Sequence, residues 1–97
     1  MKIRGQIKLK TAADGHMILS LSNRGLFNTL MLRFKLQLRH GFSRKGRHIL
    51  LPDEGIGPDY IRGNISLKTG YDEFGLYLLA INDEGDSFLR SLAKELA

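Results

Sequence analysis

The sequence predicts an α+β fold, in which a mainly antiparallel sheet of five or six strands carries a C-terminal helix packed on one face. Three observations point to this class. Segments near the N terminus alternate polar and apolar residues, 76–81 is a nearly continuous apolar run, and 82–97 combines a helix cap with one apolar stripe. A chain of 97 residues supports one core, so we expect a single compact domain, 1–97.

The first predicted element is a β-hairpin. Residues 2–10 alternate polar or cationic side chains with apolar ones, which is typical of a half-buried strand. Asp14 and Gly15 form a strong turn signal, and 16–22 returns as a second strand. Its inward side chains are expected to be Met17, Leu19 and Leu21. A hairpin is marginal alone, so its apolar side needs further strands or a helix.

The segment that follows fits either a strand or a helix. In a strand, strict alternation over 31–42 places four apolar residues on one side: Leu32, Phe34, Leu36 and Leu38. In a helix, apolar residues recur at spacings of three and four: Leu26, Phe27, Leu30, Met31, Phe34 and Leu38. A helical turn at 24–29 leading into a strand at 30–40 is intermediate. We favour a strand for 31–39, because a helix leaves Leu32 and Leu36 partly outside its stripe.

The central part of the chain predicts strands separated by turns. Residues 41–48 form a basic turn, 48–52 a brief strand, and 52–59 a loop rich in proline, glycine and acids. Residues 60–69 predict a strand with a bulge at Gly63. The core candidates in it are Ile61, Ile65 and Leu67.

The C-terminal part predicts a turn, a central strand and a helix. Residues 70–75 form the turn and 76–81 the strand, whose apolar run suits burial on both faces. Asn82 or Asp83 caps the helix, with acids in its first turn. The apolar stripe of this helix is Phe88, Leu89, Leu92 and Leu96.

The charge distribution is strongly asymmetric. Residues 1–51 hold eleven Lys and Arg against one acid, a net charge of +10, whereas 52–97 hold four against nine, a net charge of −5. If the cationic strands are extended, their charges share one sheet surface and can follow a polyanion. The expected polyanion-binding residues are Lys2, Arg4, Lys8, Lys10, Arg33, Lys35, Arg39, Arg44, Lys45 and Arg47.

These charges lead to the main functional hypothesis, a non-enzymatic binding protein that contacts a polyanion, most simply nucleic acid. Base recognition on a sheet needs exposed aromatic rings, and Phe42 and Tyr60 are the candidates for stacking. The alternative reading is a solvated basic face, partly neutralised by the acidic second half of the chain.

Evidence for catalysis is thinner. His40 and His48 flank the basic turn and would be the acid and base of a small metal-free ribonuclease, which is a second alternative. The chain has no Cys, and Asp53, Glu54 and Asp59 lack calcium-loop spacing, so we expect no metal site. No glycine pattern of a nucleotide-binding loop is present, and no cofactor is expected.

A protein partner is the other hypothesis for binding. A cationic face beside an acidic loop suits a stoichiometric inhibitor or immunity protein of the phage or mobile-element type, which binds an acidic protein. The segment GYDEFGLYLLAI, 70–81, resembles a short segment of a family of small anti-CRISPR proteins that inhibit Cas9, a resemblance of twelve residues that carries no site residue across. An exposed edge at 2–10 would also allow two chains to form a homodimer.

The chain has no signal-peptide pattern and no apolar run that suggests a membrane span. Together with the lack of Cys, this leads us to expect a cytoplasmic protein with no membrane partner.

Overall fold

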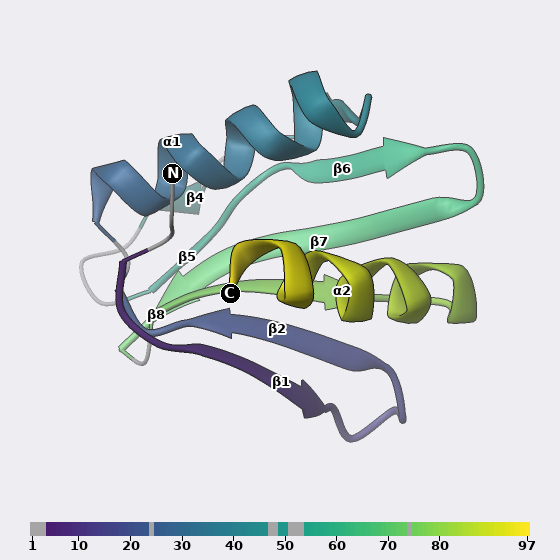
Figure 1. Ribbon diagram of the computed structural model, residues 1–97, viewed down its shortest axis with the longest axis horizontal. Coiled ribbons are helices and arrows are strands. Elements are labelled where there is room, and N and C mark those ends of the chain that lie inside the picture. Colours follow the sequence, from purple (N-terminus) through teal and green to yellow (C-terminus); the bar gives the residue numbers. More distant parts are fainter. Residues whose placement is uncertain (1–3, 24, 47–48, 51–53, 74) are drawn as a thin grey trace.

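The computed structural model describes residues 4–23, 25–46, 49–50, 54–73 and 75–97. It has the expected α+β class, with two α-helices, a π-helix (η1) and short strands around one core (Figure 1). The elements are β1 (Ile7–Thr11), β2 (Met17–Leu21), α1 (Leu26–Phe34), η1 (Lys35–Arg39), β3 (Ser43–Lys45), β4 (Ile49–Leu50), β5 (Gly55–Ile56), β6 (Asp59–Arg62), β7 (Ile65–Asp72), β8 (Gly75–Ala80) and α2 (Asp83–Leu96). None of the helices in these ranges combines the length and the apolar character that a membrane span needs.

The strands form one antiparallel sheet. Its order is β1-β2-β8-β7-β5-β4, with β6 also pairing β7 and β3 pairing β6. The expected N-terminal hairpin is confirmed as β1 and β2, and the expected central strand as β8, which lies between β2 and β7. The brief strand expected at 48–52 is present as β4 at Ile49–Leu50, and the strands that were not expected are β3 and β5, of three and two residues.

The C-terminal helix α2 closes one face of the sheet, as the sequence predicts, and Figure 1 shows it lying across β7, β8 and β2. The Asn82 side chain caps it by accepting a hydrogen bond from the Gly85 N–H at 2.8 Å. The expected stripe is buried, and it packs on sheet residues in a core that contains Leu19, Leu21, Leu67, Leu78, Leu89, Leu92 and Leu96. This core side of the sheet is distinct from an opposite face that α2 does not cover.

The strand predicted for 31–39 is wrong. Residues 26–34 form α1, and 35–39 continue it as η1, where the His40 N–H donates to the Lys35 carbonyl five residues back. Leu32 and Leu36 are buried, whereas Phe34 and Leu38 are exposed. Positions two residues apart lie about 200° apart around a helix, so the alternation divides between two opposite helix faces instead of two faces of a strand.

The buried amide of Asn28 fixes the orientation of α1. It accepts a hydrogen bond from the Arg4 N–H at 2.9 Å and donates to the Arg4 and Asn23 carbonyls at 2.8 and 2.7 Å. Asn28 is only 1% exposed, so its polar atoms require these partners. Because Asn28, Leu32 and Leu36 are spaced by four residues, they turn one side of the helix inward. Figure 1 shows α1 along the edge of the molecule beside β6.

Three local expectations are corrected. The segment 60–69 is not one strand with a bulge: β6 and β7 form a hairpin, in which Gly63 turns the chain with φ +58°. Residues 43–45 of the predicted basic turn form β3, and the predicted loop 52–59 contains β5. The first strand begins at Ile7, and residues 2 and 3 of its predicted range lie outside the described residues.

Candidate interaction surface

The most unusual surface feature is a row of large apolar side chains on α1 and η1. The row follows every fourth residue, and its exposed fractions are 72% for Leu26, 51% for Leu30, 58% for Phe34 and 71% for Leu38. We call these four residues the apolar stripe. The spacing of four residues keeps them on the helix side opposite the buried one. Single exposed apolar residues are ordinary, but an aligned set is typical of a binding surface.

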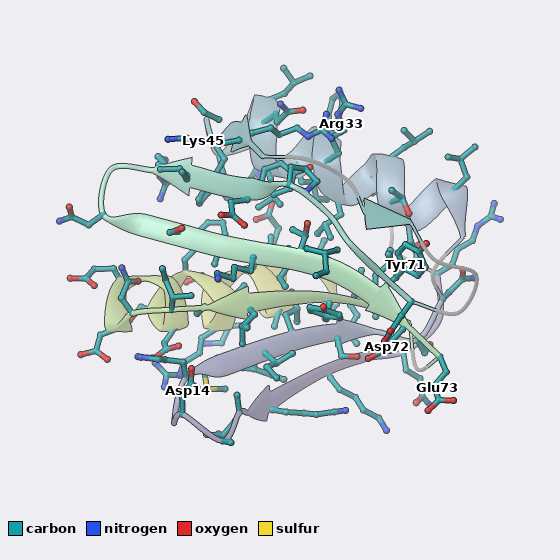
Figure 2. The ribbon with its side chains drawn as sticks, turned by 180° about the vertical axis from the view of Figure 1, so that it is seen from behind. Asp14, Arg33, Lys45, Tyr71, Asp72 and Glu73 are labelled. Atoms are coloured by element: carbon teal, nitrogen blue, oxygen red, sulfur yellow. The ribbon has the colours of Figure 1, made fainter. Side chains whose placement is uncertain are left out.

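The helical segment that carries the apolar stripe is positively charged. Residues 25–42 contain Arg33, Lys35, Arg39 and His40 but no acidic residue. Arg33 is exposed beside the stripe, and its Nε donates to the Gln37 side chain at 3.1 Å. In Figure 2, Arg33 lies on α1, whereas Asp72 and Glu73 lie at the end of the β7–β8 hairpin away from that helix.

One carboxylate from the second half of the chain holds η1 against α2. Glu95 contacts Lys35 at 3.5 Å and His40 at 2.7 Å, and it forms an ion pair with Arg39. Burial raises the Glu95 pKa, but hydrogen bonds and charges from His40 and Arg39 lower it more, so the pKa lies below its usual value. Lys35 and Arg39 are therefore partly neutralised.

The expected single plane of cations is wrong, because its basis was a strand at 31–39. Arg4 lies over the Phe27 ring, with its guanidinium carbon 4.5 Å from the ring centroid. Arg33, Lys35 and Arg39 follow α1 and η1. Arg44 pairs with Tyr60, which pairs with the core residue Leu67, so Arg44 is on the core side of the sheet. Of the other expected residues, Lys2 and Arg47 lie outside the described residues, while Lys8, Lys10 and Lys45 are exposed.

A smaller cationic surface remains on the open face of the sheet, opposite α2. The strand register aligns Lys10, Ile18, Leu79 and Lys68 in one row across β1, β2, β8 and β7. Lys8 is on the same face, two residues from Lys10. We call Lys8, Lys10 and Lys68 the open-face lysines. Half-buried Ile18 and Leu79 lie between them, so this face is partly apolar.

The expected exposure of two aromatic rings is also wrong. Phe42 is 3% exposed and Tyr60 6% exposed, so neither ring offers a free face to a base. Phe42 packs against Phe88 with ring centroids 4.8 Å apart, and the Arg62 guanidinium carbon lies 4.9 Å from its centroid. Core burial of the two rings explains the difference, because the helical 26–39 segment covers the side of the sheet where they lie.

The expected catalytic pair of His40 and His48 stays a prediction, because one of its members lies outside the described residues. His40 is bound to Glu95 and packs edge-on against Phe88, with centroids 5.1 Å apart, while His48 lies outside the described residues. His16 instead pairs with Asp86 at 2.8 Å. Within the described ranges, potential metal ligands gather where His16, Asp83 and Asp86 offer atoms within 4.8 Å of one another. The His16–Asp86 pair uses two of these groups to join the β1–β2 hairpin to α2.

Sequence reasoning did not identify the apolar stripe as a surface. The pattern was visible, because Leu26, Leu30, Phe34 and Leu38 all belong to the stripe of the helical alternative. In that alternative, however, the stripe was expected to face the core. No family model, curated protein or solved structure matches the chain in comparisons of sequence and fold.

Proposed function

We propose that the protein is a non-enzymatic binding module that docks on an acidic protein through the apolar stripe of α1 and η1. The exposure of Leu26, Leu30, Phe34 and Leu38 carries the proposal. Fully burying one such side chain contributes about 1.5–3 kcal/mol, so a partner that covers all four gains several kcal/mol before entropic costs.

The spacing of the apolar stripe matches a known mode of protein recognition. An amphipathic helix binds a hydrophobic groove through apolar residues on successive turns, as these four residues are placed. Nucleic acid is a poorer match for this surface, because phosphates attract cations but gain little from contact with leucine. The stripe therefore supports the inhibitor-like hypothesis more strongly than the polyanion hypothesis.

Charge indicates the chemistry of the partner. A second copy docked through the same stripe would bring the Arg33 side chains of the two chains together, and residues 25–42 supply no acid to compensate them, whereas Glu95 already partly neutralises Lys35 and Arg39. A groove flanked by Asp and Glu instead pairs with these cations and increases the rate of association. An acidic protein is therefore a better occupant than a second copy.

Site-specific photo-crosslinking tests this proposal. The photoreactive residue p-benzoylphenylalanine is placed at position 34, at position 38 or, as a control, at position 81, where Ile81 is 44% exposed outside the stripe. Each variant is irradiated in nuclease-treated lysate of the source cells. We expect positions 34 and 38 to crosslink to the same acidic protein and position 81 not to do so.

The identified protein is then purified and titrated with the wild-type chain. A saturable one-to-one complex that survives nuclease treatment supports the proposal. The proposal fails if positions 34 and 38 give no specific crosslink, if position 81 gives the same product, or if the stripe binds anionic vesicles in place of a protein.

The open-face lysines support a second candidate, binding of a nucleic-acid backbone. Lys10 and Lys68 are three strand spacings apart, about 14 Å, and Lys8 extends the same face. This candidate predicts DNA or RNA binding that weakens about tenfold or more between low and physiological salt. It also predicts that Lys10→Gln/Lys68→Gln weakens binding, whereas Lys94→Gln on α2 does not. Binding that is insensitive to salt, or equally affected by Lys94→Gln, contradicts it.

A further inference from the structure

A cavity of about 410 Å³ lies between α1 and the sheet. Its size is within the range of small-molecule sites. On the helix side, Leu30, Leu32 and Arg33 contribute to it, and on the sheet side Arg44, Tyr60 and Tyr71 do so, with further lining from neighbouring residues. Figure 2 shows Arg33 on α1 and Tyr71 near the end of β7. The cavity therefore opens where the helix and the sheet are not in close contact.

Positive charge converges at one part of this cavity. Arg33 comes from α1 and Arg44 from β3, and both line the same space. Both arginines are close enough to the Tyr60 hydroxyl to affect its pKa. Burial raises this pKa, whereas the charges of Arg44 and Arg33 and a hydrogen bond with Arg44 lower it. Among the described residues that line the cavity, none is acidic.

The rest of the lining is apolar or aromatic. Leu30, Leu32 and Leu76 provide aliphatic surface, and Tyr71, which shares the face of Leu76, provides a ring. A ligand that fits this arrangement has a flat or flexible apolar body and one anionic end. A carboxylate suits the anionic end, because guanidinium groups donate paired hydrogen bonds to its two oxygens.

We propose that this cavity binds a small amphipathic carboxylate, with the carboxylate at Arg33 and Arg44 and the apolar body against Leu30, Leu76 and the tyrosines. A neutral ligand of the same shape would accept weaker hydrogen bonds from the two guanidinium groups than a carboxylate does, and a cationic ligand would be repelled. The proposal goes beyond the docking function and shares only Leu30 with it, because Leu26, Phe34 and Leu38 of the apolar stripe do not line the cavity.

A matched pair of probes tests the carboxylate requirement. The probes are 1-naphthaleneacetate and its neutral isostere 1-naphthaleneacetamide, titrated into the full chain and followed by amide chemical shifts and calorimetry. We expect saturable binding of the carboxylate, shifts centred on residues 29–33, 57–60 and 69–71, and binding of the amide weaker by about tenfold or more.

Variants then locate the site. Arg44→Gln is expected to weaken carboxylate binding about tenfold, and Arg33→Gln should weaken it in the same direction. Arg33 is exposed and Gln is a good helix former, so this second variant keeps the test valid if Arg44→Gln fails to fold. Lys45→Gln is the matched control: it removes a charge next to Arg44 but on the other face of the sheet, and it should leave binding unchanged.

Three results overturn the proposal: equal binding of the carboxylate and the amide, equal losses in Arg33→Gln and Lys45→Gln, or no saturable binding at millimolar probe. A ligand that binds on the stripe instead would be lost in Leu26→Gln/Phe34→Gln/Leu38→Gln and retained in Arg33→Gln. That outcome would also exclude the cavity as the site, without bearing on whether the stripe binds a protein.

Discussion

The Nε2 atom of His40 lies 2.7 Å from the Glu95 carboxylate and joins the end of η1 to the last turn of α2. The same carboxylate contacts Lys35 and Arg39, so one acidic residue keeps the helical segment against the C-terminal helix. Because η1 carries the end of the apolar stripe, this contact helps to set the position of the proposed docking surface.

Glu95→Gln should loosen η1. The Glu95 pKa is lowered in the folded chain, so its contribution to the free energy of unfolding is complete above its ordinary value of 4.5 and is lost as pH falls through the lower folded value. At pH 7 we expect Glu95→Gln to reduce the free energy of unfolding by about 1 kcal/mol. Glu84→Gln, exposed in the first turn of α2, serves as the control in urea unfolding. Equal effects of the two substitutions would show that the contact contributes little.

The His16–Asp86 pair predicts a plateau in stability with pH. The hydrogen bond between the two side chains is the main cause that raises the His16 pKa. The same hydrogen bond is the largest cause that lowers the Asp86 pKa, and the hydrogen bond that Asp86 accepts from the Met17 N–H is the next. The His16 contribution is complete below 6.5 and is lost as pH rises through its raised folded pKa. The Asp86 contribution is complete above 3.8 and is lost as pH falls through its lowered folded pKa.

Thermal unfolding between pH 3 and pH 9 tests this plateau. We expect the melting temperature to be highest between the two ordinary pKa values and His16→Gln to flatten the decline on the alkaline side. A wild-type melting temperature that rises steadily from pH 6 to pH 9 would contradict the role of the pair.

Alanine substitutions distinguish the two faces of the helical segment. Leu36 is fully buried, and Leu36→Ala should reduce the free energy of unfolding by about 2–5 kcal/mol. Leu38 is 71% exposed, and Leu38→Ala should change it by less than about 0.5 kcal/mol. Urea unfolding of both variants makes the comparison. If 31–39 were a strand with these two leucines on one face, both substitutions would have similar effects.

Asn28→Ala should be unusually destabilising for a polar residue. The substitution removes three hydrogen bonds to the backbone of Arg4 and Asn23, and it detaches the N-terminal segment from α1. We expect a loss of about 2 kcal/mol in the free energy of unfolding. Asn64→Ala, at an exposed turn position, is the matched control. A loss no larger than that of the control would mean that water replaces these bonds without penalty.

Local sequence patterns predicted the segments whose residues are compatible with only one type of secondary structure. The cap at Asn82 and the stripe from Phe88 to Leu96 define α2, and the Asp14–Gly15 turn defines the first hairpin. Over 31–39 the local pattern is insufficient, because a repeat of two residues contains a repeat of four. Leu32 and Leu36 fit either a strand or a helix.

The candidate site was less predictable, because it depends on contacts between residues far apart in the chain. Glu95 contacts residues 55 to 60 positions away, and no sequence pattern joins it to His40 or Lys35. The strand was favoured over the helix on the assumption that large apolar residues face the core. Phe34 and Leu38 do not follow this assumption, because both side chains are exposed. Their exposure is the reason that we propose a binding partner for this surface.

The central claim is that the apolar stripe binds a protein, and calorimetric titration of the purified crosslinked partner tests it most directly. The titration compares the wild type, Leu26→Gln/Phe34→Gln/Leu38→Gln and the control Ile81→Gln, each shown to be folded by circular dichroism. We predict that the triple substitution weakens binding about 100-fold or more, while Ile81→Gln binds like the wild type. Affinity of the triple variant within about threefold of the wild type would contradict the claim. Removing three apolar side chains from a buried interface should reduce the binding free energy by much more than a threefold change in affinity represents.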